Sequence, residues 1–353
     1  MYIWFIFFYM ENVNFLDAMS LAKITNHRSG EVKLGEKMLT VSSKANAEDF
    51  IKNSEAKFVL VGIPEDIGVK ANFGREGTAL AYESTISALA NFQHNKFCKG
   101  NFILALGKLN VDEEMNIAKS LNPKNKEDRK QLFKLVEKID IEVSHLIHSI
   151  IALNKIPIVV GGGHNNAYGL IKGLALAKGK AVNAINFDAH TDFRMLEGRH
   201  SGNGFSYAFE DGFLKKYFIF GLHECFVSKS VFNEVKAKPQ QIKYCTYEEI
   251  DVRKEKNFDA ELKQALEFIK QDFFGIELDV DSLPNIPSSA MTLSGFSIDK
   301  ARQYIHFMAK SEMASYLHIC EGAPSLDQSL NQHLTGKLIA TLITDFIKSK
   351  LLE

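Results

Sequence analysis

The chain has no excess of charge of either sign, because 42 lysine and arginine residues stand against 43 aspartate and glutamate residues. That balance provides no long-range field to attract nucleic acid or an anionic membrane. Cysteine is also scarce. The four cysteines are far apart and form no CxxC pair, which argues against a disulfide framework and a structural zinc site. They are typical of buried free thiols in a reducing compartment, so we expect a cytoplasmic protein.

Long hydrophobic runs are missing as well. The most apolar segment, Met1–Met10, is shorter than the roughly 20 residues that a transmembrane helix needs. It also lacks the positive flank and the small-residue cleavage site of a signal peptide. Met10 is an alternative start. Residues 1–9 are therefore either a start-site artefact, which we favour, or a segment with a membrane or packing role.

The length of 353 residues is compatible with one large α/β domain or with two smaller ones. Short apolar runs alternate with helical patterns, which predicts a mostly parallel sheet covered on both faces. The polar stretches 108–128 and 195–212 are expected to be long loops. The predicted strands are Lys57–Ile63, Asn101–Leu106, Ile156–Val160, Val182–Phe187, Tyr217–Phe220, Gln241–Tyr244, Phe273–Val280 and Ser315–Cys320. The helical patterns include Glu127–Asn154, Asp259–Gln271, Ile298–Lys310 and Lys337–Leu352.

Four polar clusters each follow a predicted strand directly. They are Gly161-Gly162-Gly163-His164, Asp188-Ala189-His190-Thr191-Asp192, Asp279-Val280-Asp281 and the single residue Glu321. Ligands of open α/β sheets bind at the carboxyl ends of the strands, so these clusters are expected to converge on one crevice. Taken alone, each cluster has an ordinary alternative, such as a polar turn, a helix cap or a tight strand-to-helix turn.

Four aspartates and two histidines in one crevice are a donor set for metal ions. Several buried carboxylates side by side are very costly unless cations neutralise them or some stay protonated. Oxygen-rich ligation with some imidazole favours manganese, although affinity alone does not exclude zinc, cobalt or nickel. Two such ions about 3.5–4 Å apart can hold a bridging hydroxide and direct it at an electrophilic carbon.

These motifs resemble the ureohydrolase family, which includes arginase, agmatinase and formimidoylglutamase. The resemblance runs from about Val61 to about Phe346. It implies a three-layer α/β/α fold around an eight-stranded, mostly parallel sheet, formed by one domain over residues 51–353 after an N-terminal extension over residues 1–50. Relatives commonly assemble into trimers or hexamers, so a homo-oligomer is expected.

The resemblance also implies roles for the clustered residues. Two Mn²⁺ ions per chain would be bridged by Asp188 and Asp279. His164 and Asp192 would complete the site of one ion, and His190 and Asp281 the site of the other. Glu321 falls where the family places a glutamate that grips amidine or guanidine nitrogens. The alternative for Glu321 is a surface or capping residue.

Within the family, the chain is most similar to formimidoylglutamases. The segment 62–77 and the turn at His164 carry part of this similarity, and Phe205 carries the rest. Arginases and agmatinases have a histidine at the place of Phe205 that is thought to shuttle protons. Ser201 and Asn203, in the same motif, are expected substrate contacts. The chain departs from these relatives at Asn165, where a glutamate is common, and in the loop after Asp281.

Arg194 lies two residues beyond Asp192 and is therefore expected on the rim of the crevice. A guanidinium fork suits a carboxylate and disfavours a cationic substrate. N-formimidoyl-L-glutamate fits this arrangement better than agmatine does. The alternative is that Arg194 only pairs with Glu197. Arg75 is a second, weaker candidate for substrate binding or loop anchoring.

The sequence thus predicts hydrolysis of N-formimidoyl-L-glutamate to L-glutamate and formamide, a step of histidine breakdown. Phe205 cannot donate a proton to the departing nitrogen. We expect Asp192 to do so after taking the proton of the hydroxide, with the substrate ammonium or solvent as the alternatives. Glu321 would hold the cationic group. Two alternatives stay open: hydrolysis of another guanidino or amidino acid, or a metal-binding regulatory protein without turnover. His223 either lines the crevice or, as we favour, is a core or rim histidine.

Overall fold

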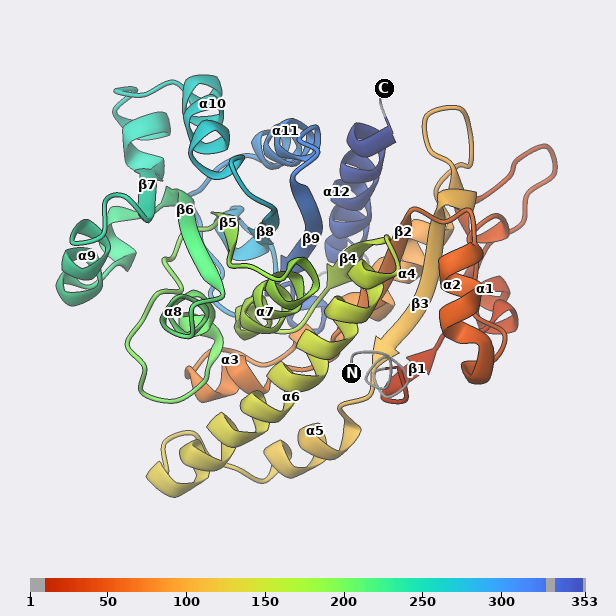
Figure 1. Cartoon of the computed structure of the whole chain (residues 1–353), viewed down its shortest axis with the longest axis horizontal. Coiled ribbons are helices and arrows are strands. Elements are labelled where there is room, and N and C mark those ends of the chain that lie inside the picture. The colour runs from red at the N-terminus through yellow and green to blue at the C-terminus, as the bar shows by residue number, and fades with distance from the viewer. Residues whose placement is uncertain (1–9, 328–333, 352–353) are drawn as a thin grey trace.

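The computed structural model describes residues 10–327 and 334–351, in which a single sheet of nine strands is flanked by helices (Figure 1). The strand order is β1-β3-β2-β4-β9-β8-β5-β6-β7. Residues 1–9, expected to be a start-site artefact or a membrane or packing segment, lie outside the described residues, and so does Leu352 at the end of the last predicted helix. Across the described ranges, no helix combines the length and the apolar character needed to span a membrane.

Eight of the nine strands are those predicted from the sequence, and all eight run parallel. The expected count of eight is one short, because the antiparallel strand β1 (Val13–Phe15) adds to the edge at β3. Three residues carry too little pattern for a strand prediction. The parallel strands are β2 (Phe58–Gly62), β3 (Ile103–Leu109), β4 (Ile156–Val160), β5 (Val182–Phe187), β6 (Leu214–Leu222), β7 (Ile242–Thr246), β8 (Phe274–Asp279) and β9 (Ala314–Cys320).

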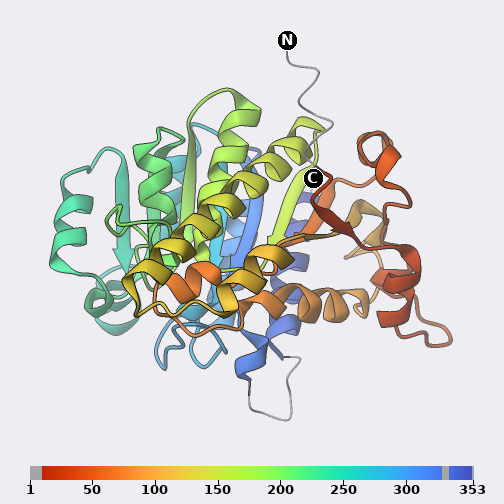
Figure 2. The same cartoon turned by 90° about the horizontal axis from the view of Figure 1, so that it is seen from below.

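The three-layer arrangement is confirmed, because each face of the sheet has its own apolar cluster. Alternate residues of a strand point to opposite faces: Phe58 and Leu60 belong to one cluster, and Val59 and Val61 to the other. The first face is covered by α4 (Ala81–Ala90), α10 (Phe258–Ile269), α11 (Ile298–Ala309) and α12 (Leu334–Leu351). The second is covered mainly by α6 (Lys126–Ala152), α7 (Ala167–Lys178), α8 (Gly204–Glu210) and α9 (Lys229–Lys236), and α6 is the long yellow-green helix in Figure 2.

Both polar stretches predicted as long loops contain helices, so that prediction is wrong. Residues 108–128 include α5 (Asp112–Lys119), whose sole buried residue is Ala118. Residues 195–212 include the short turn η7 (Ser201–Asn203) and α8. A mostly exposed helix and a very short buried one both lack the periodic apolar pattern on which sequence prediction depends.

The segment before residue 51, expected to be an extension, packs against the sheet in its described part. Besides β1 it contains α1 (Ala18–Ile24) and the first residues of α2 (Ala47–Asn53), and Leu21 and Ala47 are buried in the two clusters. The expectation of four buried thiols is wrong for Cys225, which is exposed, and right for the other three cysteines.

The four strands that precede the polar clusters are consecutive neighbours in the sheet, in the order β4-β9-β8-β5. Their parallel direction brings all four carboxyl ends to one edge. The sheet order therefore brings the four polar clusters together as predicted, although some of them lie more than a hundred residues apart in the sequence.

A buried ion pair fixes the segment between β5 and α8, which carries several predicted site residues. Arg199 is 2 % exposed and donates to both carboxylate oxygens of Asp140 in α6, at 2.8 and 3.1 Å. Its guanidinium carbon lies 5.0 Å from the ring centroids of both Tyr168 and Tyr207. It also donates to the backbone carbonyl of Asn165 at 2.8 Å, next to His164. Arg199 therefore holds three segments together at the edge of the sheet.

We expect Arg199→Met to lower the free energy of unfolding by about 3–5 kcal/mol, because it leaves Asp140 buried without a counter-charge. Urea unfolding of the purified variant measures this loss. The matched control is Arg253→Met, whose ion pair with Glu224 lies at the surface, and which should lower the stability far less. Equal losses in the two variants would contradict this account of Arg199.

Candidate metal centre

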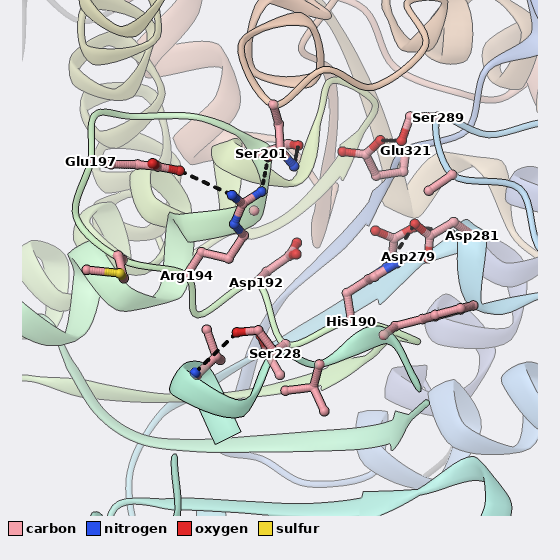
Figure 3. A pocket seen from close by; sticks show the side chains of 18 of the residues that line it. His190, Asp192, Arg194, Glu197, Ser201, Ser228, Asp279, Asp281, Ser289 and Glu321 are labelled. Carbon is pink, nitrogen blue, oxygen red and sulfur yellow. Dashed lines mark hydrogen bonds and ion pairs between the residues drawn. The ribbon is translucent and has the colours of Figure 1, made fainter. Parts of the chain in front are cut away.

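A cavity of about 440 Å³ opens at the carboxyl edge of the sheet. Predicted site residues line it, as Figure 3 shows: His190, Asp192, Arg194, Ser201, Asp279, Asp281 and Glu321. His164 and Asp188 lie behind this lining and are fully buried. The structure thus brings all six predicted metal ligands together at one end of the cavity.

The first group of possible ligand atoms surrounds His164. Its Nδ1 atom lies 2.8 Å from Asp192 Oδ2 and 3.3 Å from the Oδ2 atoms of both Asp188 and Asp279. The four side chains offer ligand atoms within 4.8 Å of one another. Neither ring nitrogen of His164 has a hydrogen-bond partner in the described structure, so the short approach to Asp192 lacks hydrogen-bond geometry. An imidazole nitrogen that faces three carboxylates without such a bond fits a shared cation.

The second group contains Asp188, His190 and Asp281, again within 4.8 Å. His190 Nδ1 lies 3.5 Å from Asp188 Oδ1 and 3.3 Å from Asp281 Oδ2. Asp188 therefore belongs to both groups, with one oxygen toward each histidine. Asp279, the other expected bridge, falls in the first group but not in the second.

Local turns at the strand ends aim these carboxylates. Asp188 Oδ1 accepts the backbone N–H of His190 at 2.7 Å, and Asp279 Oδ1 accepts that of Asp281 at 2.8 Å. Asn186 donates to the other oxygen of Asp188 at 2.8 Å. These motifs therefore do form polar turns, which was the alternative to metal ligation. Forming the turn does not exclude ligation, because each carboxylate keeps free lone pairs.

The electrostatics of the cluster favour bound protons or bound cations. Burial, together with the charges of Asp281 and Asp188, raises the pKa of Asp279 well above its ordinary value. Burial and the charge of Asp188 also raise the pKa of Asp192. Burial disfavours a charged His164, but the neighbouring Cys320 and the aspartates outweigh it and raise the pKa of that imidazole. Divalent cations would relieve the same repulsion between carboxylates.

Glu321 lies across the cavity from Arg194 (Figure 3). Its backbone is left-handed, with φ of 61°, which turns the chain at the end of β9. The Oε1 atom accepts the backbone N–H of His164 at 2.8 Å, and the Oε2 atom accepts the hydroxyl of Ser289. Burial raises the pKa of Glu321 to about 8. Glu321 thus caps the turn that begins at His164, as the alternative reading expected, and the same carboxylate also lines the cavity.

Arg75 contacts the loop after β8 and is not part of the cavity lining. It donates to the backbone carbonyls of Ser288 at 3.0 Å and Ser289 at 3.3 Å. It therefore anchors the loop that carries Ser289. Sequence reasoning missed Ser289, because the loop resembled the family only loosely.

Arg194 lies in the cavity wall and also forms the alternative pair. It donates to Asn72 Oδ1 at 2.6 Å and to Glu197 Oε1 at 3.2 Å, with 47 % of its side chain exposed. Ser201 lines the cavity and accepts a hydrogen bond from Asn72 at 3.1 Å. The rim therefore presents one cationic fork beside hydroxyl and amide groups.

Asn203, predicted as a substrate contact, lies outside the cavity lining and is fully buried. Its amide donates to the carbonyls of Met195 and Gly198, and its oxygen accepts from Arg199 at 2.7 Å. Asn203 is therefore engaged within the β5–α8 segment, whose conformation it stabilises, and its role as a substrate contact stays a prediction.

Two further features surround His164. Phe205 is buried edge-on to its imidazole, with ring centroids 5.1 Å apart. On the other side, Glu277 accepts from Tyr316 and pairs with His318 Nδ1, each at 2.6 Å. His164 Nε2 lies 3.6 Å from Glu277 Oε2. The sequence signal for this layer is a polar side chain within each of two buried strands, Glu277 in β8 and His318 in β9.

Comparison with known proteins covers most of the chain. The arginase family model matches residues 56–348. Formimidoylglutamases from two strains of Streptococcus pyogenes, of serotypes M12 and M18, are 28 % identical over 295 residues, which is 81 % of this chain and 82 % of theirs.

Solved structures share the fold. A formimidoylglutamase from Bacillus subtilis has a TM-score of 0.72 at 19 % identity, with 92 % of this chain and 94 % of that one covered. A Trypanosoma cruzi formiminoglutamase with Mn²⁺ has a TM-score of 0.69 at 18 % identity and coverages of 90 % and 98 %. An agmatine ureohydrolase of Thermoplasma volcanium has a TM-score of 0.65 at 19 % identity, covering 85 % and 91 %. The matched family model spans far more than half of the sequence, and the chain belongs to the arginase family.

Proposed function

We propose that this chain hydrolyses N-formimidoyl-L-glutamate to L-glutamate and formamide, using two divalent cations. The observation that carries the proposal is a single cavity with two metal-type donor groups, joined through Asp188, at its base. Its walls offer a buried carboxylate, Glu321, and a cationic fork, Arg194. A substrate with a cationic amidine at one end and carboxylates at the other matches that distribution of charge. The likeness to formimidoylglutamases points to the same substrate.

The proposed ligands divide as the two donor groups do. His164, Asp192, Asp188 and Asp279 would hold one ion, and Asp188, His190 and Asp281 the other. The family resemblance alone would add Asp279 to the second ion. Carboxylate oxygens combined with imidazole suit manganese, which a structural relative contains. Two bound ions supply a hydroxide nucleophile at neutral pH and neutralise developing negative charge.

The remaining residues bind and orient the substrate. Glu321, held by the His164 backbone and Ser289, would accept hydrogen bonds from the formimidoyl nitrogens. Asp192, placed between His164 and the cavity, would take a proton from the nucleophile and deliver it to the departing nitrogen. Arg194 would bind a substrate carboxylate, with Ser201 beside it.

A second candidate is hydrolysis of another amidino or guanidino acid. The pairing of Arg194 with Glu197 favours it, because that pair already satisfies part of the guanidinium.

We further propose, from the family resemblance and the three buried free thiols, a cytoplasmic homo-oligomer, either a trimer or a hexamer.

The function is tested with purified protein loaded with Mn²⁺ and offered N-formimidoyl-L-glutamate, arginine, agmatine and other amidino acids. We expect formamide and glutamate from the first compound and no urea from arginine or agmatine. Product analysis by mass spectrometry distinguishes the outcomes. Urea release from either guanidine compound would overturn the substrate assignment.

Arg194→Ala should raise KM for N-formimidoyl-L-glutamate roughly 10- to 100-fold, because hydrogen bonds to a charged group are lost. Arg194→Lys should give an intermediate KM, since it keeps the charge but not the fork. The control is a simple alkyl formamidine without carboxylates, whose kcat/KM should be unchanged. An unchanged KM for the dicarboxylate in Arg194→Ala would favour the second candidate.

Metal binding should release protons. The pKa values of Asp279 and His164, both raised well above their ordinary values, favour bound protons on the metal-free cluster, and a cation must displace these protons. We expect Mn²⁺ binding to release roughly one proton or more per chain, and its apparent affinity to increase as the pH rises. Calorimetric titration in buffers of different ionisation enthalpy measures the number. A binding enthalpy independent of the buffer would contradict this expectation.

A further inference from the structure

His190 is held less tightly than the other proposed metal ligands. Its side chain is 30 % exposed, whereas those of the other five are at most 12 % exposed. A histidine that binds a metal usually donates its second ring nitrogen to a carboxylate or carbonyl, and that bond fixes the ring. Within the described ranges, no such bond from a protein group reaches His190 Nε2. Its orientation therefore needs another source.

A stack of aromatic rings covers one face of this imidazole. Phe226 lies against His190, with ring centroids 5.3 Å apart and an angle of 17° between the planes. His223 stacks on Phe226 with ring centroids 5.1 Å apart and 5° between the planes, and Tyr247 stacks on His223 at 4.7 Å and 4°. Four nearly parallel rings thus lead from the candidate metal centre to the region after β7.

Backbone and side-chain contacts keep the stack in place. The N–H of His223 donates to the carbonyl of Ala189 at 3.0 Å, directly beside His190. His223 itself is 5 % exposed. Phe296, buried in the core, meets Tyr247 edge-on with centroids 5.2 Å apart. The outer end of the stack therefore rests on the core, while its inner end faces the cavity.

We propose that Phe226 is a positioning residue whose ring, supported by His223 and Tyr247, fixes the His190 imidazole. Phe226 would thereby set the affinity for the ion held by Asp188, His190 and Asp281, which we call the second ion. Rotation about the bond to an imidazole ring has broad minima, so an unsupported ring samples orientations in which Nδ1 points away from Asp281. Stacking removes those orientations. This inference rests on the dinuclear centre of the proposed function.

The test is Mn²⁺ binding to the full-length, metal-free protein, followed by calorimetry and by the EPR signal of coupled manganese pairs. Phe226→Ala should weaken the second ion roughly three- to tenfold, in line with the strength of an aromatic pair, and leave the first ion unchanged. Phe226→Tyr, which keeps a stacking ring, should restore the affinity. Phe232→Ala is the matched control, because Phe232 packs on Tyr244 away from the cavity, and it should bind both ions as the parent does.

A double-mutant cycle shows whether Phe226 acts through His190. In a His190→Ala background, Phe226→Ala should cause no further loss of metal affinity. If Phe226→Ala does not fold, His223→Ala removes the next ring and should weaken the second ion in the same direction. If Phe226→Ala binds both ions as the parent does, or weakens both equally, the role of Phe226 is overturned while the proposed metal centre stands. A parent protein that binds fewer than two ions overturns the proposed metal centre and this inference with it.

Discussion

Repulsion among buried carboxylates is the constraint on which this structure depends. Asp188, Asp192, Asp279 and Asp281 meet around two histidines at one edge of a sheet, where burial raises the pKa of Asp279 and Asp192. No lysine or arginine among the described residues forms an ion pair with any of these four carboxylates. The cluster therefore requires protons or cations, and the two groups joined through Asp188 match two cations.

The sheet supplies the geometry that this cluster needs. Because β4, β9, β8 and β5 are neighbours and run parallel, four short motifs leave one edge together. The layers behind them are ordered by long-range contacts. Arg199 ties the β5–α8 segment to Asp140, and Glu277 with His318 lies behind His164. Rigid support of this kind keeps charged groups in place before a substrate arrives.

Motifs at strand ends could be predicted because buried parallel strands appear as apolar runs, and the polar residues that interrupt their ends stand out. The contacts of Ser289, Arg199 and Glu277 could not be. Each depends on a partner between 32 and 59 residues away or on a neighbouring strand, and no local pattern encodes such pairs. The burial of Asn203 could not be predicted for the same reason, because its motif is local while Arg199 and two backbone carbonyls bind its side-chain amide.

Anomalous X-ray scattering at the manganese absorption edge, from crystals of the Mn²⁺-loaded protein, tests the dinuclear centre most directly. We predict two peaks about 3.5–4 Å apart, with one oxygen of Asp188 beside each peak. A single peak, or none among the six proposed side chains, would contradict it.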